Sequence, residues 1–79
     1  MKIEILGFEV SIELTVGQFE IFNSVEDQCG AISRLENKGA KEVDYSDHFG
    51  SYIFFKVDKL EDCIEIEKEI CSILAEEEK

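Results

Sequence analysis

The side chains able to act as nucleophiles or metal ligands are few and scattered along the chain. His48 is the only histidine, and the three cysteines are Cys29, Cys63 and Cys71. A nucleophilic Cys–His pair needs its members in hydrogen-bond contact, and no spacing in the sequence brings Cys29 to His48. Cys63 and Cys71 lie about 12 Å apart along a helix, so they cannot ligate one ion together. We therefore expect neither covalent catalysis nor a metal site.

Catalytic sequence motifs are missing as well. The chain has no P-loop, no dinucleotide-binding glycine loop, no paired-histidine zinc motif and no nucleophile elbow. Asp44, Asp47 and His48 could hold a cation weakly, but their spacing matches no established calcium loop. We expect a protein without enzymatic activity and without a cofactor.

Acidity is the strongest feature of the composition. Nineteen Asp and Glu residues stand against eight Lys and Arg, which gives a formal net charge of −11. Direct binding of nucleic acid needs cations that displace the counterions of the phosphates, and an anionic membrane surface would repel this chain. The expected partner is therefore a basic protein, and long-range attraction would accelerate that encounter.

The length of 79 residues fits a single compact domain, residues 1–79. Hydrophobic residues make up 44% of the chain, which is enough for a core. No apolar run approaches the roughly 20 residues that a membrane span needs. Three cysteines cannot all pair, and without a secretion signal this indicates free, partly buried thiols in the reducing cytoplasm.

The first half of the chain predicts strands. Isoleucines alternate with polar residues over residues 2–5, and the parity switches after a two-residue turn at Gly7-Phe8. A second turn over residues 15–18 returns the chain as a third strand over residues 19–22. The alternative is one long strand over residues 2–14 with a bulge at Gly7. In the hairpin, the residue numbers of antiparallel partners add up to 15. This register pairs Ile5 with Val10, Ile3 with Ile12 and Lys2 with Glu13.

The second half predicts two helices and a further hairpin. Ser24, with Asn23 as an alternative cap, is typical of a helix start and Lys38-Gly39 of a helix end, with Gly30 inside the helix. The hairpin over residues 41–46 and 51–58 turns at His48-Phe49-Gly50 and pairs Tyr45 with Ile53, Val43 with Phe55 and Glu42 with Lys56. The last helix begins at Asp58 or Lys59 and is expected to bury Leu60, Cys63, Ile64, Ile70, Ile73 and Leu74.

These elements predict an α+β fold, a two-layer sandwich in which an antiparallel sheet of about five strands carries two helices on one face. The order is strand-strand-strand-helix-strand-strand-helix. If residues 2–14 are one strand, the order becomes strand-helix-strand-strand-helix, which is close to a ferredoxin-like half-pattern.

One candidate binding surface lies on the last helix. Acids spaced three or four residues apart share one side of a helix, and such a row is comparable to a phosphate backbone in charge and spacing. A solvated helix face explains the same row without any function. The row comprises Glu61, Asp62, Glu65 and Glu69.

The other candidate surface is the outer face of the sheet. In the predicted registers Phe22, Tyr52 and Phe54 point away from the core, and aromatic anchors inside a charged rim are typical of protein-binding surfaces. A homodimer contact, or a register error that buries these rings, would explain the pattern equally well. The acids beside the rings are Glu13, Glu20 and Asp44, and the hairpin tip adds Asp47 and an exposed Phe49.

In size, acidity and α+β form without catalytic residues, the chain resembles phage-encoded inhibitors of host defence. These include anti-CRISPR proteins, anti-restriction DNA mimics and the uracil-DNA glycosylase inhibitor. The resemblance covers gross properties of the whole chain and no specific residues. It implies a non-enzymatic inhibitor that occupies the basic nucleic-acid-binding surface of a target protein, in the host cytoplasm if a phage encodes it.

Two alternatives stay open. One is a small regulatory or assembly module that homodimerises through its outer sheet face. The other is a metal-binding or ligand-binding domain.

Overall fold

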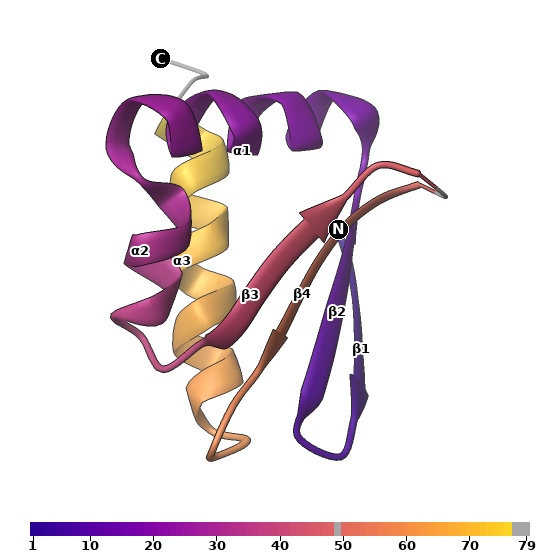
Figure 1. Cartoon of the computed structure of the whole chain (residues 1–79), viewed down its shortest axis with the longest axis vertical. Coiled ribbons are helices and arrows are strands. Elements are labelled where there is room, and N and C mark those ends of the chain that lie inside the picture. The colour runs from indigo at the N-terminus through magenta and orange to yellow at the C-terminus, as the bar shows by residue number, and fades with distance from the viewer. Residues whose placement is uncertain (49, 77–79) are drawn as a thin grey trace.

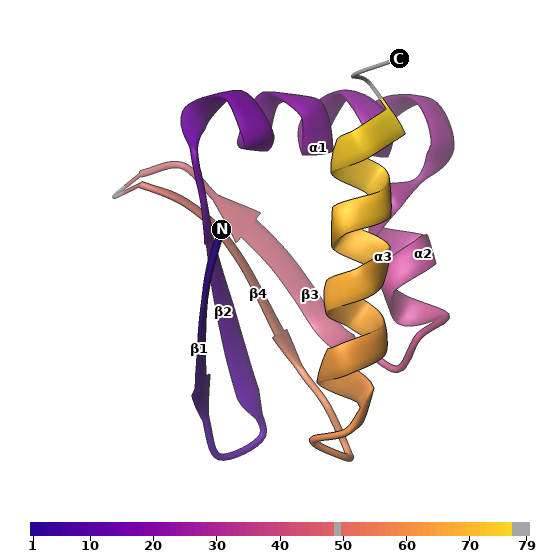
Figure 2. The same ribbon diagram turned by 180° about the vertical axis from the view of Figure 1, so that it is seen from behind.

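The computed structural model describes residues 1–48 and 50–76 of the chain. Within them, four strands form one antiparallel sheet in the order β1-β2-β4-β3, and three helices lie on one of its faces (Figures 1 and 2). The α+β class is thus as predicted, with four strands and three helices instead of five and two. The elements are β1 (Lys2–Leu6), β2 (Glu9–Leu14), α1 (Val16–Cys29), α2 (Ala31–Glu36), β3 (Lys41–Ser46), β4 (Ser51–Lys56) and α3 (Asp62–Glu76).

The first hairpin has the predicted register. Gly7 lies in the turn with a φ of 64°, a left-handed conformation that costs glycine little because it has no Cβ. The alternative of one bulged strand over residues 2–14 is therefore wrong. The observed pairs include Lys2 with Glu13, Ile3 with Ile12 and Ile5 with Val10.

The predicted third strand is wrong, because residues 19–22 belong to α1. Thr15 forms a capping box: its Oγ1 accepts a hydrogen bond from the Gln18 backbone N–H at 3.1 Å, and its own N–H donates to Gln18 Oε1 at 2.9 Å. The buried residues Phe19, Phe22 and Val25 then recur every three positions, so they share the inner face of a helix. The four residues 19–22 are too few to separate the strand period from the helix period, and the capping box at Thr15 selects the helix.

The buried position of Phe22 corrects its predicted place on the outer sheet face. Its side chain is fully buried, and its ring packs edge-on against Tyr45 of β3 with the centroids 5.8 Å apart. Phe19 contacts the same tyrosine at 5.9 Å. Since Tyr45 projects from the inner face of the sheet, these contacts place α1 across that face.

Gly30 ends α1 instead of lying inside a longer helix. Its φ of 68° is left-handed, and its N–H donates to the Glu26 carbonyl as a helix C-cap. The chain then turns into α2, where the Glu26 carboxylate accepts a hydrogen bond from the Ile32 N–H at 3.1 Å. Ser24, the predicted helix start, therefore lies in the middle of α1.

The second hairpin keeps its predicted register only near the tip. Tyr45 pairs with Ile53 as expected, but Lys41 instead of Glu42 lies opposite Lys56. The register shifts between Lys41 and Asp44, where Glu42 adopts a φ of 51°. This bulge overturns the predicted Glu42–Lys56 register, because Glu42 and Val43 together span the position opposite Phe55. β4 ends at Lys56, before the predicted Asp58.

The last helix begins at Asp62, later than the predicted Asp58 or Lys59. Its buried stripe is Ile66, Ile70, Ile73 and Leu74. Ile64 lies about 200° from Ile66 around the helix axis and is exposed, and Leu60 precedes the helix and is exposed too. Their predicted burial is wrong, while Cys63 is half-buried. Among the described residues, no helix has the length and apolar content that crossing a membrane requires.

Two glycine substitutions should have opposite effects on stability. Gly17 lies in the first turn of α1, and a Cβ at this position would have only Thr15 Oγ1 nearby, at 4.0 Å, so Gly17→Ala should raise the free energy of unfolding by about 0.5 kcal/mol. Gly30→Ala should lower it by about 1–2 kcal/mol because alanine is strained at positive φ. Urea denaturation measures both. Destabilisation by Gly17→Ala would favour the predicted turn over the helix.

Candidate functional site

The face of the sheet opposite the helices is the candidate binding surface, and we call it the open sheet face. In both ribbon views α2 and α3 stand on the other side of the strands and α1 crosses above the strand ends (Figures 1 and 2), with Phe19 and Phe22 packed on the inner-face Tyr45. Outside the bulge between Lys41 and Asp44, strand pairing fixes which residues project there, because partners across a ladder share a face. They are Lys2, Glu4, Leu6, Glu9, Ser11, Glu13, Asp44, Ser46, Tyr52, Phe54 and Lys56.

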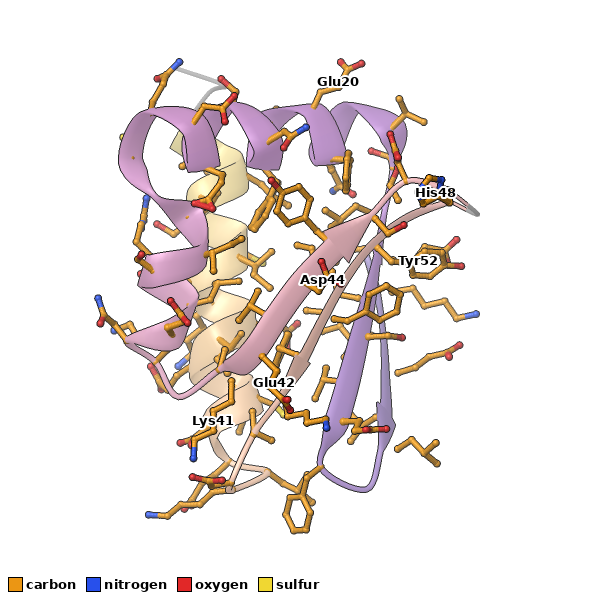
Figure 3. All side chains as sticks on the ribbon, viewed as in Figure 1. Glu20, Lys41, Glu42, Asp44, His48 and Tyr52 are labelled. Atoms are coloured by element: carbon orange, nitrogen blue, oxygen red, sulfur yellow. The ribbon has the colours of Figure 1, made fainter. Side chains whose placement is uncertain are left out.

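Two stacked aromatic rings lie on the open sheet face. Tyr52 and Phe54 are two positions apart on β4 and therefore share a face. Their ring centroids lie 5.7 Å apart and their planes are inclined by 17°. Phe54 is 40% exposed, and Figure 3 shows Tyr52 beyond the strands on the side away from the helices. Gly50 leaves room for the tyrosine, since a Cβ there would lie 2.8 Å from Tyr52 Cε2. The stack is therefore both supported and accessible.

Acids flank the aromatic stack on the neighbouring strands. Glu13 of β2 lies opposite Tyr52, and Asp44 of β3 lies opposite Phe54. Glu20, predicted beside them, instead projects from α1 at the top of Figure 3. The rings thus have a carboxylate on either side.

A shallow groove of about 800 Å³ continues the open sheet face toward the turn of the first hairpin. Phe54 and Leu6 form apolar walls, and Lys56 lies in it with its Nζ 2.9 Å from Glu42 Oε2 and 3.7 Å from Glu9 Oε1. The hydrogen bond and charge of Glu42, together with the charge of Glu9, raise the pKa of Lys56 above its ordinary 10.5. The lysine is therefore fully protonated at neutral pH.

The charge of the open sheet face is negative. Its lysines, Lys2 and Lys56, are outnumbered by acids, and Lys56 is already bound to two carboxylates. The predicted register of the first hairpin already places Glu4 and Glu9 on the same face as Lys2, so these two acids could have been identified from the sequence. The bulge that brings Glu42 to this face has no such signal. The acids are Glu4, Glu9, Glu13, Glu42 and Asp44.

The predicted acidic row on α3 lies on the helix side of the sheet, away from the aromatic stack. Glu69 is only 18% exposed and its Oε2 lies 3.3 Å from Arg34 Nη2 of α2. Asp62 packs so close to Gly39 that a Cβ there would lie 2.7 Å from its Oδ2. Glu65 has Lys68 at 3.8 Å, and Glu61 is exposed in the turn before α3 and is not on the helix as predicted. The row is therefore partly neutralised and is no part of the open sheet face.

The remaining predicted residues are spread over the molecule. Asp47 and His48 are exposed at the β3–β4 tip, whereas Phe49 lies outside the described residues. Cys29 ends α1 at the far side of the molecule from that tip (Figure 1). Burial, with a smaller effect of Asp62, raises the pKa of the Cys63 thiol. Within residues 1–48 and 50–76, no three metal-ligating side chains converge on one point.

Comparison of the chain with protein-family models, curated proteins and solved structures gives no match. Its function is therefore inferred from its own geometry and charge. The open sheet face combines accessible rings, a groove and an excess of carboxylates. Chemically, such a surface can bind a partner.

The pKa of Lys56 should respond unequally to its two carboxylate neighbours. Glu42→Gln should lower this pKa toward 10.5 more than Glu9→Gln does, because Glu42 is closer and forms the hydrogen bond. A raised pKa in the folded state adds stability below pH 10.5, and this contribution is lost as the pH rises through the folded-state pKa. NMR titration of the lysine side chain measures the shift, and equal shifts in both variants would contradict the geometry.

Proposed function

We propose that this chain is a non-enzymatic inhibitor that docks its open sheet face on a basic, nucleic-acid-binding surface of a partner protein. The observation that carries the proposal is the Tyr52–Phe54 stack between carboxylates, in which Phe54 is exposed and Tyr52 half-buried. The partner's own nucleic acid and this chain would then compete for the same cations.

The rings and the acids have different tasks in this proposal. Burial of an aromatic anchor at the centre of an interface is commonly worth about 2 kcal/mol or more, so Tyr52 and Phe54 account for affinity. Carboxylates at a rim contribute mainly to the rate of encounter and to selectivity for basic partners. Glu13 and Asp44 are placed to meet lysine or arginine side chains around the rings.

Charge also favours a basic partner over a face-to-face homodimer. Two open sheet faces in contact would bring the same excess of carboxylates against one another. Like charges buried without partners cost free energy. A surface rich in Lys and Arg instead pairs with Glu13 and Asp44 and leaves the stack in contact with apolar side chains.

The acidic row on α3 supports the proposal less than the sheet does. Its Glu69 is engaged by Arg34, so fewer of its carboxylates are available to a partner. We therefore propose that Glu61, Glu65 and the general negative field of the chain accelerate the encounter with the partner. The open sheet face makes the contact itself.

Matched charge reversals test the proposal. The immobilised chain should capture basic proteins at low salt, and an added DNA duplex should displace them. Against such a partner, Tyr52→Ser/Phe54→Ser should weaken binding more than tenfold, and Glu13→Lys/Asp44→Lys should do so as well. Glu61→Lys/Glu65→Lys should mainly slow association. Isothermal titration and surface-based kinetics give these values.

The control is Glu20→Lys/Glu36→Lys, which makes the same change of net charge at exposed helix positions. It should change affinity less than threefold at about 0.15 M salt, because exposed charges far from contact are largely screened there. An equal loss in this control, or binding indifferent to the ring and sheet variants, would overturn the assignment to the open sheet face.

A further inference from the structure

The outer edge of β1 presents unpaired backbone groups. The Val57 N–H donates to the Phe8 carbonyl at 3.0 Å, so Phe8 and Val57 form a hydrogen-bonded pair. Hydrogen-bonded pairs recur at every second residue of an antiparallel ladder, so Val10, Ile12 and Leu14 direct their backbone N–H and C=O groups to β4. The residues between them face β1, where their partners are Lys2, Glu4 and Leu6. Ile3 and Ile5 therefore direct their N–H and C=O groups outward, where no strand within the described residues pairs with them.

The two edges of the sheet differ in how they are protected. The β3 edge carries the bulge between Lys41 and Asp44, and bulges of this kind discourage pairing with another strand. The β1 edge is regular over all five residues and contains no proline. It is therefore the edge that is geometrically ready to accept a further strand.

Apolar side chains border this free edge. Ile3 and Ile5 project to the inner face, yet Ile5 is 51% exposed. The reason is that α1 packs on β2 and β4, and α2 packs on β3, so the helical cover thins out toward β1. A strand added beside β1 would cover Ile5 and satisfy the outward backbone groups together.

We infer that the occupant of the β1 edge is β1 of a second copy of this chain, paired antiparallel about a two-fold axis through Ile3. In this register Ile3 lies opposite Ile3 of the second copy, and Lys2 lies opposite its Glu4. Ile3 forms the hydrogen-bonded pair, as its outward backbone groups require. The Lys2–Glu4 pairs then fall at non-hydrogen-bonded positions, where Cα atoms are about 4.5 Å apart and side chains are closest.

Charge selects this register from its neighbours. Pairing about Glu4 would bring two Glu4 carboxylates into the closest cross-strand position, which is unfavourable. Pairing about Ile5 would place Glu4 opposite Leu6 and form no ion pair. The chosen register gives two opposite-charge pairs. Within one chain, the contact between Lys2 and Glu4 is long, at 3.8 Å, and exposed. Those side chains are free to be redirected.

The acidity of the whole chain does not prevent this contact. β1 itself carries one lysine and one glutamate and is therefore neutral. At about 0.15 M salt the Debye length is about 8 Å, so acids elsewhere on the two copies are screened from each other. The dimer would be one continuous sheet of two four-stranded halves, with all helices on the same side.

A charge-swap series tests the register. Sedimentation velocity over a concentration series should show a monomer–dimer equilibrium for the natural chain. Lys2→Glu and Glu4→Lys should each raise the dimer dissociation constant at least tenfold, because both ion pairs become repulsive. The Lys2→Glu/Glu4→Lys double variant restores opposite charges and should return the constant to within about threefold. Lys59→Glu and Glu36→Lys, exposed and outside β1, are the charge-matched controls and should leave it unchanged.

Hydrogen exchange supplies a test on the natural chain alone. With rising concentration the Ile3 and Ile5 amides should become protected, whereas those of Lys2 and Glu4, already directed to β2, should not change. A monomer at every concentration up to about 1 mM, a dimer insensitive to the single swaps, or a dimer lost in Tyr52→Ser/Phe54→Ser would each overturn the inference. Its failure leaves partner binding through the open sheet face intact, since different residues carry the two.

Discussion

The packing of α1 across the inner face of the sheet is the contact that shapes the rest of the molecule. Phe19 and Phe22 reach Tyr45, and the capping box at Thr15 starts the helix directly after β2, so the chain must turn over that face. α3 then buries its own apolar stripe on the same side. With the helices used there, the opposite face has no cover among the described residues. Polar side chains are expected on it, and the Tyr52–Phe54 stack with its exposed Phe54 is the feature that needs a functional reason.

Sequence reasoning succeeds where two independent rules agree and fails where one local segment fits two periods. In the first hairpin, apolar pairing and the charges of Lys2 and Glu13 select the same register, and the structure has it. Residues 19–22 alternate like a strand and also fit a helix, and the residues of the capping box at Thr15 are equally compatible with a turn. The bulge at Glu42 could not be predicted, because positive φ is typical of glycine, asparagine and aspartate, so a glutamate gives no signal for it.

The candidate site shows the same division. Strand alternation alone predicts Tyr52, Phe54 and Asp44 on one face, and they lie there. Helical spacing also assigns the acids on α3 to one side of a helix, but Arg34 arrives from α2 and engages Glu69. That neutralisation depends on how two helices pack, which helical periodicity within α3 does not encode. Counting carboxylates along a sequence therefore overstates the charge that a surface offers.

The proposed partner and the proposed second copy require opposite properties of neighbouring surfaces. Binding to a cationic cleft needs an uncompensated anionic face, and the open sheet face has one around Tyr52. Self-pairing needs a neutral edge with complementary charges, and β1 has Lys2 and Glu4. Both needs are met on one sheet because side chains set the charge of a face whereas backbone groups set the pairing of an edge. Edge pairing would place two aromatic stacks on one continuous surface. A partner with two basic sites would then bind both stacks at once, and its avidity would exceed the affinity of either single contact.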